Sequence, residues 1–202
     1  MKLFYAPGAC SLAPHIALIE AGLPFSTERV DLRAQPHTTE SGTDYKSVNP
    51  KGYVPALVLD NGEVLTEAAV VLQYIADLAT EKRLAPDRNT IDRYRLQEWL
   101  NFISSELHKG FGPFWKPDTP QEQKDAAWAR LSQRLEWAVQ QFNGKDYLMG
   151  QFSIADCYLF TILRWTDVFK LPLDSWPELQ AYRSRVAARP SVQQALKDEG
   201  IA

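Results

Sequence analysis

The fold of this chain is decided by its first stretch, residues 2–22, KLFYAPGACSLAPHIALIEAG. The apolar run at residues 2–5 predicts a strand, and Pro7 and Gly8 end it because proline fixes φ while glycine tolerates unusual φ. Apolar residues then recur with the spacing of an amphipathic helix: Leu12, Ile16, Ile19 and Leu23. Gly22 is a helix stop. The stretch therefore predicts a strand, a turn and a helix.

Cys10 lies where this strand turns into the helix. A thiol there faces unpaired backbone N–H groups and the positive end of the helix dipole. Such a position lowers a cysteine pKa from ~8.5 to roughly 3.5–7.5, which predicts a reactive thiolate. The alternative is a cysteine that only fills space, because free cysteine is among the most buried residue types. This stretch alone leaves both interpretations open.

The rest of the first 80 residues predicts a small sheet with helices against it. Residues 25–32 form a second strand, and the polar residues 33–46 hold a short helix or a surface loop. Asn61-Gly62 between two apolar runs predicts a hairpin. Thr66 is expected to cap a helix whose apolar stripe follows: Val70, Val71, Tyr74, Ile75 and Leu78. This order suggests both parallel and antiparallel pairs, hence an α/β domain.

Beyond residue 80 the pattern becomes helical throughout. Residues 81–89 are polar, contain a proline and predict a linker. No strand is predicted after them, and Ser153-Ile154-Ala155-Asp156 is a capping box before an apolar run. We therefore predict an α/β domain at 1–80, a linker at 81–89 and an all-α helical bundle at 90–202.

Composition excludes several functions. The net charge of -3 gives no bulk basic field for nucleic acid or an anionic membrane, and no apolar run approaches a transmembrane length. The histidines and cysteines have no metal-like spacing, so no metal site is predicted. Two distant cysteines and a start without a signal-peptide pattern predict a protein of the reducing cytoplasm.

Two further stretches in the α/β domain suggest a ligand site. A cis Val54-Pro55 bond would expose the backbone of Val54 to an added peptide strand, although proline at a strand start needs no such role. The helix start at Glu67 and Ala68 offers N–H groups to a carboxylate and a carboxylate to an ammonium, which suits an α-amino acid end. The alternative for Glu67 is that it complements the helix dipole.

A polar sector on a helix of the second domain is the third candidate. On a wheel of about 100° per residue, Asn101, Ser105, His108 and Lys109 fall together, opposite the apolar stripe. The sector donates hydrogen bonds and carries a titratable imidazole. The alternative is an ordinary solvated helix face.

Taken in order, these motifs resemble glutathione transferases, most closely the bacterial beta class. The matching stretches are YAPGACSL at 5–12, NPKGYVPAL at 49–57, LTE at 65–67, ELHKGF at 106–111 and SIAD at 153–156. The resemblance covers essentially the whole chain. It implies a thioredoxin-like first domain, an all-α second domain, glutathione as co-substrate with no metal, and a homodimer.

The resemblance also implies a role for each site residue. Cys10 and His108 would be catalytic, both at the glutathione sulfur, with Cys10 able to form a mixed disulfide. Val54 would pair with the cysteinyl backbone through a cis Pro55, and Glu67 and Ala68 would hold the γ-glutamyl end. The remaining positions would line the site, some across a dimer interface: Asn101, Ser105, Glu106 and Lys109. Glu106 falls off the polar sector and fits better as a cross-dimer contact.

The sequence departs from the family pattern at residues 33–37, RAQPH, which lack the lysine expected for the glycine carboxylate. Arg33 is a possible substitute. Ala68 lacks the hydroxyl that some relatives have, so only its backbone N–H would donate.

The predicted function is a detoxifying transferase that conjugates glutathione to electrophilic small molecules, with thiol-disulfide exchange through Cys10. One alternative is a reductase of glutathione mixed disulfides. Another is a non-catalytic carrier of apolar ligands, with Phe111, Phe114 and Trp115 as cleft residues rather than ordinary core.

Overall fold

The computed structural model describes residues 1–202 and divides into two compact units, one of residues 1–85 with 188–202 and one of residues 86–187. The first is a mixed α/β unit and the second is entirely helical, which confirms the predicted fold class. The division differs from the predicted one, which ended the first domain at residue 80 and gave the chain's last residues to the helical bundle. The C-terminal helix packs instead against the first unit.

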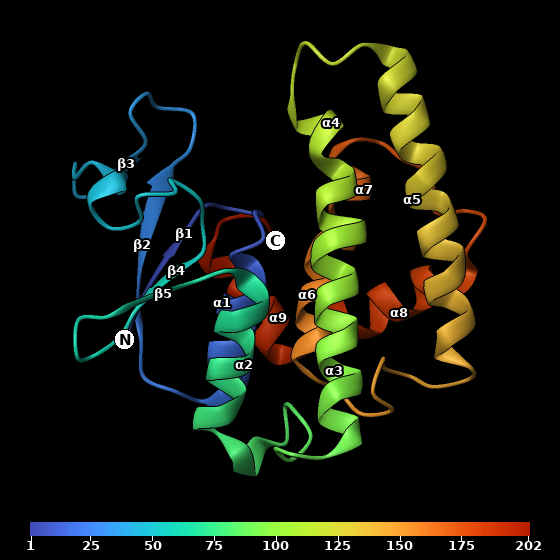
Figure 1. Cartoon of the computed structure of the whole chain (residues 1–202), viewed down its shortest axis with the longest axis horizontal. Helices are drawn as coiled ribbons and strands as arrows, with labels where there is room; N and C mark the ends of the chain where they lie inside the picture. The colour runs from blue at the N-terminus through green and yellow to red at the C-terminus, as the bar shows by residue number, and fades with distance from the viewer. The chain divides into compact units, whose positions relative to one another are not determined.

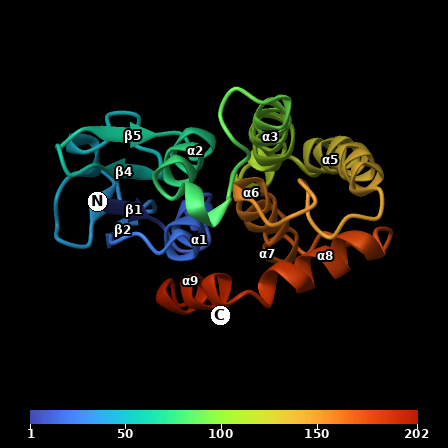
Figure 2. The same cartoon turned by 90° about the horizontal axis from the view of Figure 1, so that it is seen from below.

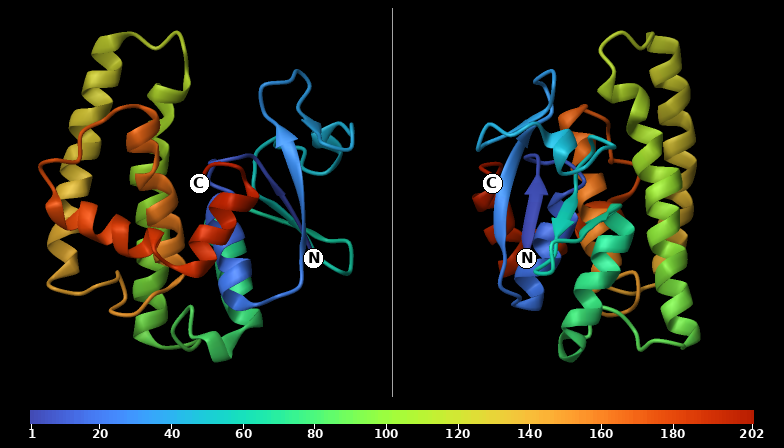
Figure 3. Two further views of the ribbon diagram at one scale, coloured as in Figure 1. Left: turned by 180° about the vertical axis from the view of Figure 1, so that it is seen from behind. Right: turned by 60° about the vertical axis from the view of Figure 1, so that its left-hand side comes forward.

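The first unit contains one five-stranded sheet, in the order β3-β2-β1-β4-β5. Its strands are β1 (Lys2–Tyr5), β2 (Ser26–Asp31), β3 (Thr38–Thr39), β4 (Ala56–Val58) and β5 (Val64–Thr66). β1 and β2 are parallel and run side by side in the right panel of Figure 3. The other neighbouring pairs are antiparallel, so the predicted mixed sheet and hairpin are confirmed.

The polar stretch after β2 is mostly loop, which is one of the two structures that we expected. It contributes the short edge strand β3 and a single 3₁₀ turn, η1 (Tyr45–Ser47). Strands and turns this short have too few residues to show a periodic pattern. Tyr45 of η1 is fully buried and belongs to an apolar cluster with Phe4, Val54 and Ala56. The stretch therefore closes one side of the core.

Two helices cover the sheet on one face, α1 (Leu12–Ala21) and α2 (Ala68–Leu78), as Figure 2 shows. α1 ends as predicted, because Gly22 adopts φ 67° and its N–H bonds back to the last turn. A 3₁₀ turn, η2 (Thr80–Lys82), follows α2. On β1 and β4 the paired Leu3 and Leu57 are both fully buried, and so is Ala56 in the next register position, so this part of the sheet is covered on both faces.

The C-terminal helix, α9 (Pro190–Asp198), completes the first unit beside α1 (Figure 2). Arg189 and Ser191 both bond the carboxylate of Glu20 at the end of α1. Beyond the helix, the buried carboxylate of Glu199 accepts the N–H of Gly8 at 2.8 Å and lies 3.0 Å from Nδ1 of His15. Residues more than 180 positions apart in sequence thus hold the turn that precedes Cys10.

The second unit contains a long helical rod and a second long helix beside it (Figure 1). The rod is built from α3 (Ile91–Phe102), the π-helical η3 (Ile103–His108), the 3₁₀ turn η4 (Lys109–Phe111) and α4 (Gly112–Trp115). The other helices are α5 (Gln121–Phe142), α6 (Ile154–Leu163), α7 (Trp165–Val168) and α8 (Pro177–Ala187). Gly110 allows η4 to approach α5 closely, because an added Cβ would lie 2.6 Å from a methyl carbon of Leu131.

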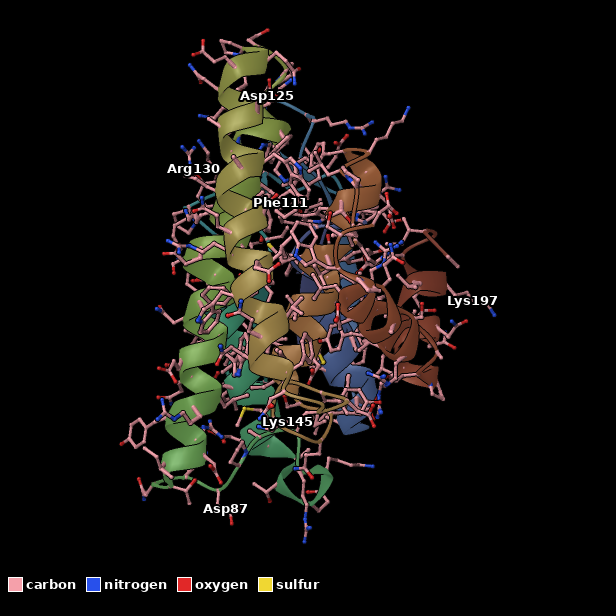
Figure 4. The ribbon with its side chains drawn as sticks, turned by 90° about the vertical axis from the view of Figure 1, so that its right-hand side faces the viewer. Asp87, Phe111, Asp125, Arg130, Lys145 and Lys197 are labelled. Atoms are coloured by element: carbon pink, nitrogen blue, oxygen red, sulfur yellow. The ribbon has the colours of Figure 1, made fainter.

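The core of the second unit lies around α6, of which every residue is buried. Phe111 belongs to this core, whereas Asp125 and Arg130 lie on the outer, solvent-exposed face of α5 (Figure 4). The predicted capping box begins α6: the carboxylate of Asp156 accepts the Ser153 N–H and hydroxyl, each at 2.8 Å. None of the helices combines the length and the apolar composition needed to cross a membrane.

Candidate active site

Cys10 lies in the turn between β1 and α1, as predicted. Ser11 holds this turn together, because its hydroxyl accepts the N–H of Ala6 at 3.1 Å and donates to the Ala6 carbonyl at 3.3 Å. The Cys10 residue is partly exposed, and its thiol donates to the carbonyl oxygen of Val54 at 3.1 Å. Cys157 is the other cysteine; it is fully buried in α6, as expected of a packing residue.

The predicted low pKa of Cys10 is wrong for the structure as it stands. The pKa of the thiol is raised to about 12, mainly by burial and also by the carboxylate of Glu67. The backbone N–H groups of Cys10 and Ser11 lower the pKa, which is the helix-start effect that the sequence suggested, but burial outweighs them. The contact with Val54 O acts in the same direction as burial, because a carbonyl oxygen accepts from a thiol and not from a thiolate.

Val54 presents an open backbone group beside Cys10. Its peptide bond to Pro55 is cis, as the resemblance implied, and the residue is buried just before β4. Its carbonyl accepts the Cys10 thiol, while its N–H forms no hydrogen bond within the chain. A peptide-like ligand can therefore bind the free N–H of Val54, and it can bind the Val54 carbonyl only by sharing it with the Cys10 thiol.

Glu67 occupies a strained position between β5 and α2. Its φ of 68° lies in the left-handed region, which is uncommon for a residue other than glycine and is concentrated at ligand and active sites. The expected N-cap is therefore corrected: Thr66 ends β5 and pairs with Ala56, and Glu67 itself precedes the helix. The exposed Glu67 carboxylate is 2.5 Å from Nζ of Lys51. No pattern in the sequence pointed to this ion pair.

Ala68 begins α2 with a buried methyl group. Its N–H, as the first of the helix, has no acceptor within the chain, which leaves it available to an anion. Glu67 therefore supplies an acceptor and Ala68 a donor, side by side. Arg33 and Gln35, at the departure from the family pattern, are both exposed, and the Arg33 N–H is used by Asp31.

In the second unit, the candidate residues lie on a helix that changes geometry among them. Residues 103–108 are π-helical. A wheel of about 100° per residue, which assumes an α-helix, therefore does not describe this segment, and the predicted placement of Ser105 and His108 in one sector with Asn101 and Lys109 rests on the wrong helix geometry. Asn101, Ser105 and Lys109 are exposed, and the Ser105 hydroxyl donates to the Asn101 carbonyl at 2.9 Å. Glu106 is also exposed, and its carboxylate forms an ion pair with Nε of Arg134 at 2.8 Å.

His108 is held by the core of the second unit rather than lying on a solvated face. Its Nδ1 is 2.7 Å from the hydroxyl of Tyr158 in α6, and its ring meets that of Trp165 edge to face at 5.0 Å between centroids. These contacts fix the orientation of the imidazole. Tyr158 was not identified from the sequence, because it follows the capping box in an apolar run and reads as ordinary core.

An aromatic cluster continues from Trp165. Its members, joined by ring centroid distances of 4.7–6.2 Å, are Phe111, Phe114, Trp115, Trp165 and Phe169. Of the three predicted aromatics, Phe111 is fully buried, as the core interpretation requires, and Trp115 is half exposed. In the structure, no group of three or more His, Cys, Asp or Glu side chains is arranged to hold a metal ion.

Comparison with known proteins gives matches in both units. Residues 8–78 match the family model of the glutathione S-transferase N-terminal domain, and residues 102–190 match that of the C-terminal domain. The chain is 48% identical to glutathione S-transferase GstA of Escherichia coli O157:H7 over the full length of both.

Two solved structures cover the chain and are themselves covered completely. A sphingomonad glutathione S-transferase complexed with glutathione is 46% identical, with a TM-score of 0.95. A bacterial beta class glutathione S-transferase of Sphingomonas chungbukensis is 45% identical, also with a TM-score of 0.95. The two family models and the full-length similarity to these proteins show that this chain belongs to the glutathione S-transferase family, in its bacterial beta class.

Proposed function

We propose that this transferase binds glutathione along Val54, Glu67 and Ala68 and conjugates its sulfur to an apolar electrophile. The observation that carries the proposal is that three residues of the first unit, Cys10, Val54 and Glu67, lie close together. The Cys10 thiol touches Val54 O, and the Glu67 carboxylate is near enough to raise the pKa of that thiol. A tripeptide that lies between Glu67 and Val54 would bring its own sulfur to Cys10.

Two parts of glutathione, the γ-glutamyl and the cysteinyl residue, find complementary groups in this arrangement. The α-ammonium of the γ-glutamyl end fits the Glu67 carboxylate, and the α-carboxylate fits the N–H at the start of α2. The cysteinyl backbone fits the free N–H and the carbonyl of Val54 as an added strand. A sphingomonad relative whose solved structure contains glutathione supports this choice of co-substrate.

The high pKa of Cys10 favours a role as hydrogen-bond donor in conjugation. At neutral pH it is a protonated thiol, whose acceptor in the free protein is Val54 O. When the cysteinyl N–H of glutathione takes that carbonyl, the Cys10 S–H is released to donate to the glutathione thiolate. After the glutathione thiol has lost its proton to solvent, the thiolate attacks the electrophile: a sulfur–carbon bond forms, and the leaving group departs with the bonding electron pair.

Thiol-disulfide exchange through Cys10 is the second candidate, favoured by the position of its sulfur beside the proposed cysteinyl subsite. A Cys10 thiolate would attack a glutathione disulfide, so that a mixed disulfide forms and a thiolate leaves. The pKa of about 12 makes this step slow in the free protein near pH 7, because only the thiolate is the nucleophile.

His108 and its neighbours Asn101, Ser105, Glu106 and Lys109 enter the proposal through the resemblance of their motif. The Tyr158 and Trp165 contacts favour a role for His108, because they fix an imidazole that would otherwise rotate freely. The half-exposed Trp115 and its aromatic neighbours favour an apolar, planar electrophile. A homodimer, a cytoplasmic location and a detoxifying role complete the proposal; the two free cysteines fit a reducing compartment.

The test is kcat/KM of wild type, Cys10→Ala and His108→Ala with a chloronitrobenzene and with a glutathione mixed disulfide. We expect Cys10→Ala to abolish exchange while keeping part of the conjugation, because the glutathione sulfur is the nucleophile. We expect His108→Ala to lose about tenfold or less, since general acid–base assistance of about 10²–10⁴-fold is shared with Cys10. A wild-type protein that binds glutathione and apolar dyes but turns over neither substrate would support the carrier alternative.

A further inference from the structure

Lys51 and Glu67 form an ion pair whose two ends are held by unrelated parts of the first unit. Lys51 belongs to the turn after η1, where its N–H donates to the Asn49 side chain at 3.2 Å and the buried Asn49 amide donates to Tyr53 O at 2.6 Å. Glu67 is fixed by its left-handed backbone before α2. Their exposed side chains meet at 2.5 Å, beside the unpaired N–H of Ala68.

An α-amino acid end needs one carboxylate for its ammonium and one or more donors for its carboxylate. The structure contains both charges, but each neutralises the other. A ligand ammonium that binds Glu67 therefore has to replace the ammonium of Lys51. The exchange costs little, because an exposed ion pair contributes about 0–1 kcal/mol.

We propose that Lys51 is a specificity residue that binds the α-carboxylate of the γ-glutamyl end, having been displaced from Glu67 by the α-ammonium. This inference rests on the proposed glutathione site. The two charges of the ligand are attached to the same carbon, so the carboxylate arrives next to the displaced lysine. The flexible four-carbon stem of lysine lets Nζ follow it while the Asn49 turn keeps the backbone in place.

One protein–protein ion pair is thereby replaced by two protein–ligand pairs. Ala68 N–H and Lys51 Nζ would share the carboxylate, which compensates for the hydroxyl that Ala68 lacks. The arrangement distinguishes the zwitterionic γ-glutamyl end from a peptide that carries only the ammonium. With such a peptide, Lys51 would be displaced from Glu67 and would gain no new partner.

The experiment measures calorimetric affinities of wild type and Lys51→Met for three reduced peptides. The peptides are glutathione, glutathione monoethyl ester with its glycine carboxylate blocked, and the analogue with γ-aminobutyrate in place of the γ-glutamyl residue. Methionine keeps the stem and removes the charge. Lys46→Met is the matched control, because Lys46 is another exposed lysine of the same loop region and has no role in the proposal.

We expect Lys51→Met to bind glutathione and its monoethyl ester about three- to tenfold more weakly, the scale of one exposed ion pair. Its affinity for the γ-aminobutyryl analogue should be unchanged or higher, because a competitor for Glu67 has been removed. Lys46→Met should bind all three peptides like wild type.

Equal changes for all three peptides, or no change for any, would overturn the assignment. A loss that disappears with the ester would overturn it too, since Lys51 would then bind the glycine carboxylate. If Glu67→Gln weakens glutathione binding while Lys51→Met does not, only the inference is wrong. If wild type binds none of the peptides, the proposed function is wrong and the inference falls with it.

Discussion

The starts of α2 and α6 differ in whether their polar groups are paired within the chain. At α6 the carboxylate of Asp156 is completely buried and accepts four hydrogen bonds, from Leu148 N–H, both donors of Ser153 and the Tyr182 hydroxyl. At α2 the carboxylate of Glu67 is exposed, its backbone is in the left-handed region, and the first N–H of the helix has no partner. Both helices begin beside an acidic residue, but only one begins with its polar groups satisfied.

The difference teaches which helix start carries stability and which carries binding. Polar groups that are already paired inside the protein have nothing to offer a ligand, and removing one partner leaves the others unsatisfied. Polar groups that stay open or exposed contribute little to folding and gain their partners from a ligand. Removal of the carboxylate is therefore expected to reduce stability at the start of α6 and ligand binding at the start of α2.

The largest expected effect comes from removing the buried carboxylate. Asp156→Ala should lower the free energy of unfolding by about 3–5 kcal/mol, because three or four buried donors lose their acceptor and each costs about 1–3 kcal/mol. Urea denaturation followed by tryptophan fluorescence measures this. Glu67→Ala is the matched control and should change stability by less than about 1 kcal/mol. Equal losses for the two variants would contradict the division of roles.

The pH dependence of stability sharpens the same comparison. Burial raises the pKa of Asp156 from 3.8 to about 6, so the folded chain holds this proton more tightly than the unfolded chain does. The free energy of unfolding contributed by this group is then highest below about pH 4 and falls as pH rises to about 6, by about 3 kcal/mol in all. Asp156→Asn, which cannot titrate, should lack this decrease. Parallel pH profiles for wild type and Asp156→Asn would show that Asp156 does not titrate in this range.

Glu67→Gln tests the binding side. It keeps the shape of the side chain and removes the charge that the ligand ammonium is proposed to meet. Glutathione affinity should fall by about 1.5–3 kcal/mol, the usual contribution of a hydrogen bond to a charged group, with an unfolding curve like that of wild type. Calorimetry decides, and unchanged affinity would mean that Glu67 serves only its own helix.

The smallest expected effect is that of Ser153→Ala. Its hydroxyl is one of four donors to Asp156, and the backbone N–H of the same residue remains in place. Stability should fall by about 1 kcal/mol, within the usual range for loss of an N-cap residue. Differential scanning calorimetry resolves a change of this size. A loss as large as that of Asp156→Ala would mean that the hydroxyl, and not the carboxylate, organises the cluster.

Much of the fold could be predicted from local patterns in the sequence. The strand and helix around Cys10, the Asn61-Gly62 hairpin and the capping box at Ser153 each depend on neighbouring residues, and all three are confirmed. The short strand β3 was too brief to show a period. The place of α9 was not predicted because it depends on Glu199 meeting Gly8 and His15, a contact between opposite ends of the chain.

The site was predictable in its residues and less so in its electrostatics. Helix-start position suggested a low pKa for Cys10, and the N–H groups do act in that direction. The degree of burial, which decides the outcome, depends on the whole fold and has no local signal. Likewise, the spacing of the apolar residues does not distinguish the π-helical segment at residues 103–108 from an α-helix, so the sequence predicted the wrong helix geometry there.

The contact of Glu199 with the turn before Cys10 has a consequence for biosynthesis. The first unit needs residues 1–85 and also residues 188–202, whereas the second unit is one uninterrupted segment, residues 86–187. On the ribosome β1 and α1 are made before the helical unit, but their partners in residues 188–202 are made after it. The helical unit is therefore synthesised completely before the α/β unit can acquire all of its native contacts.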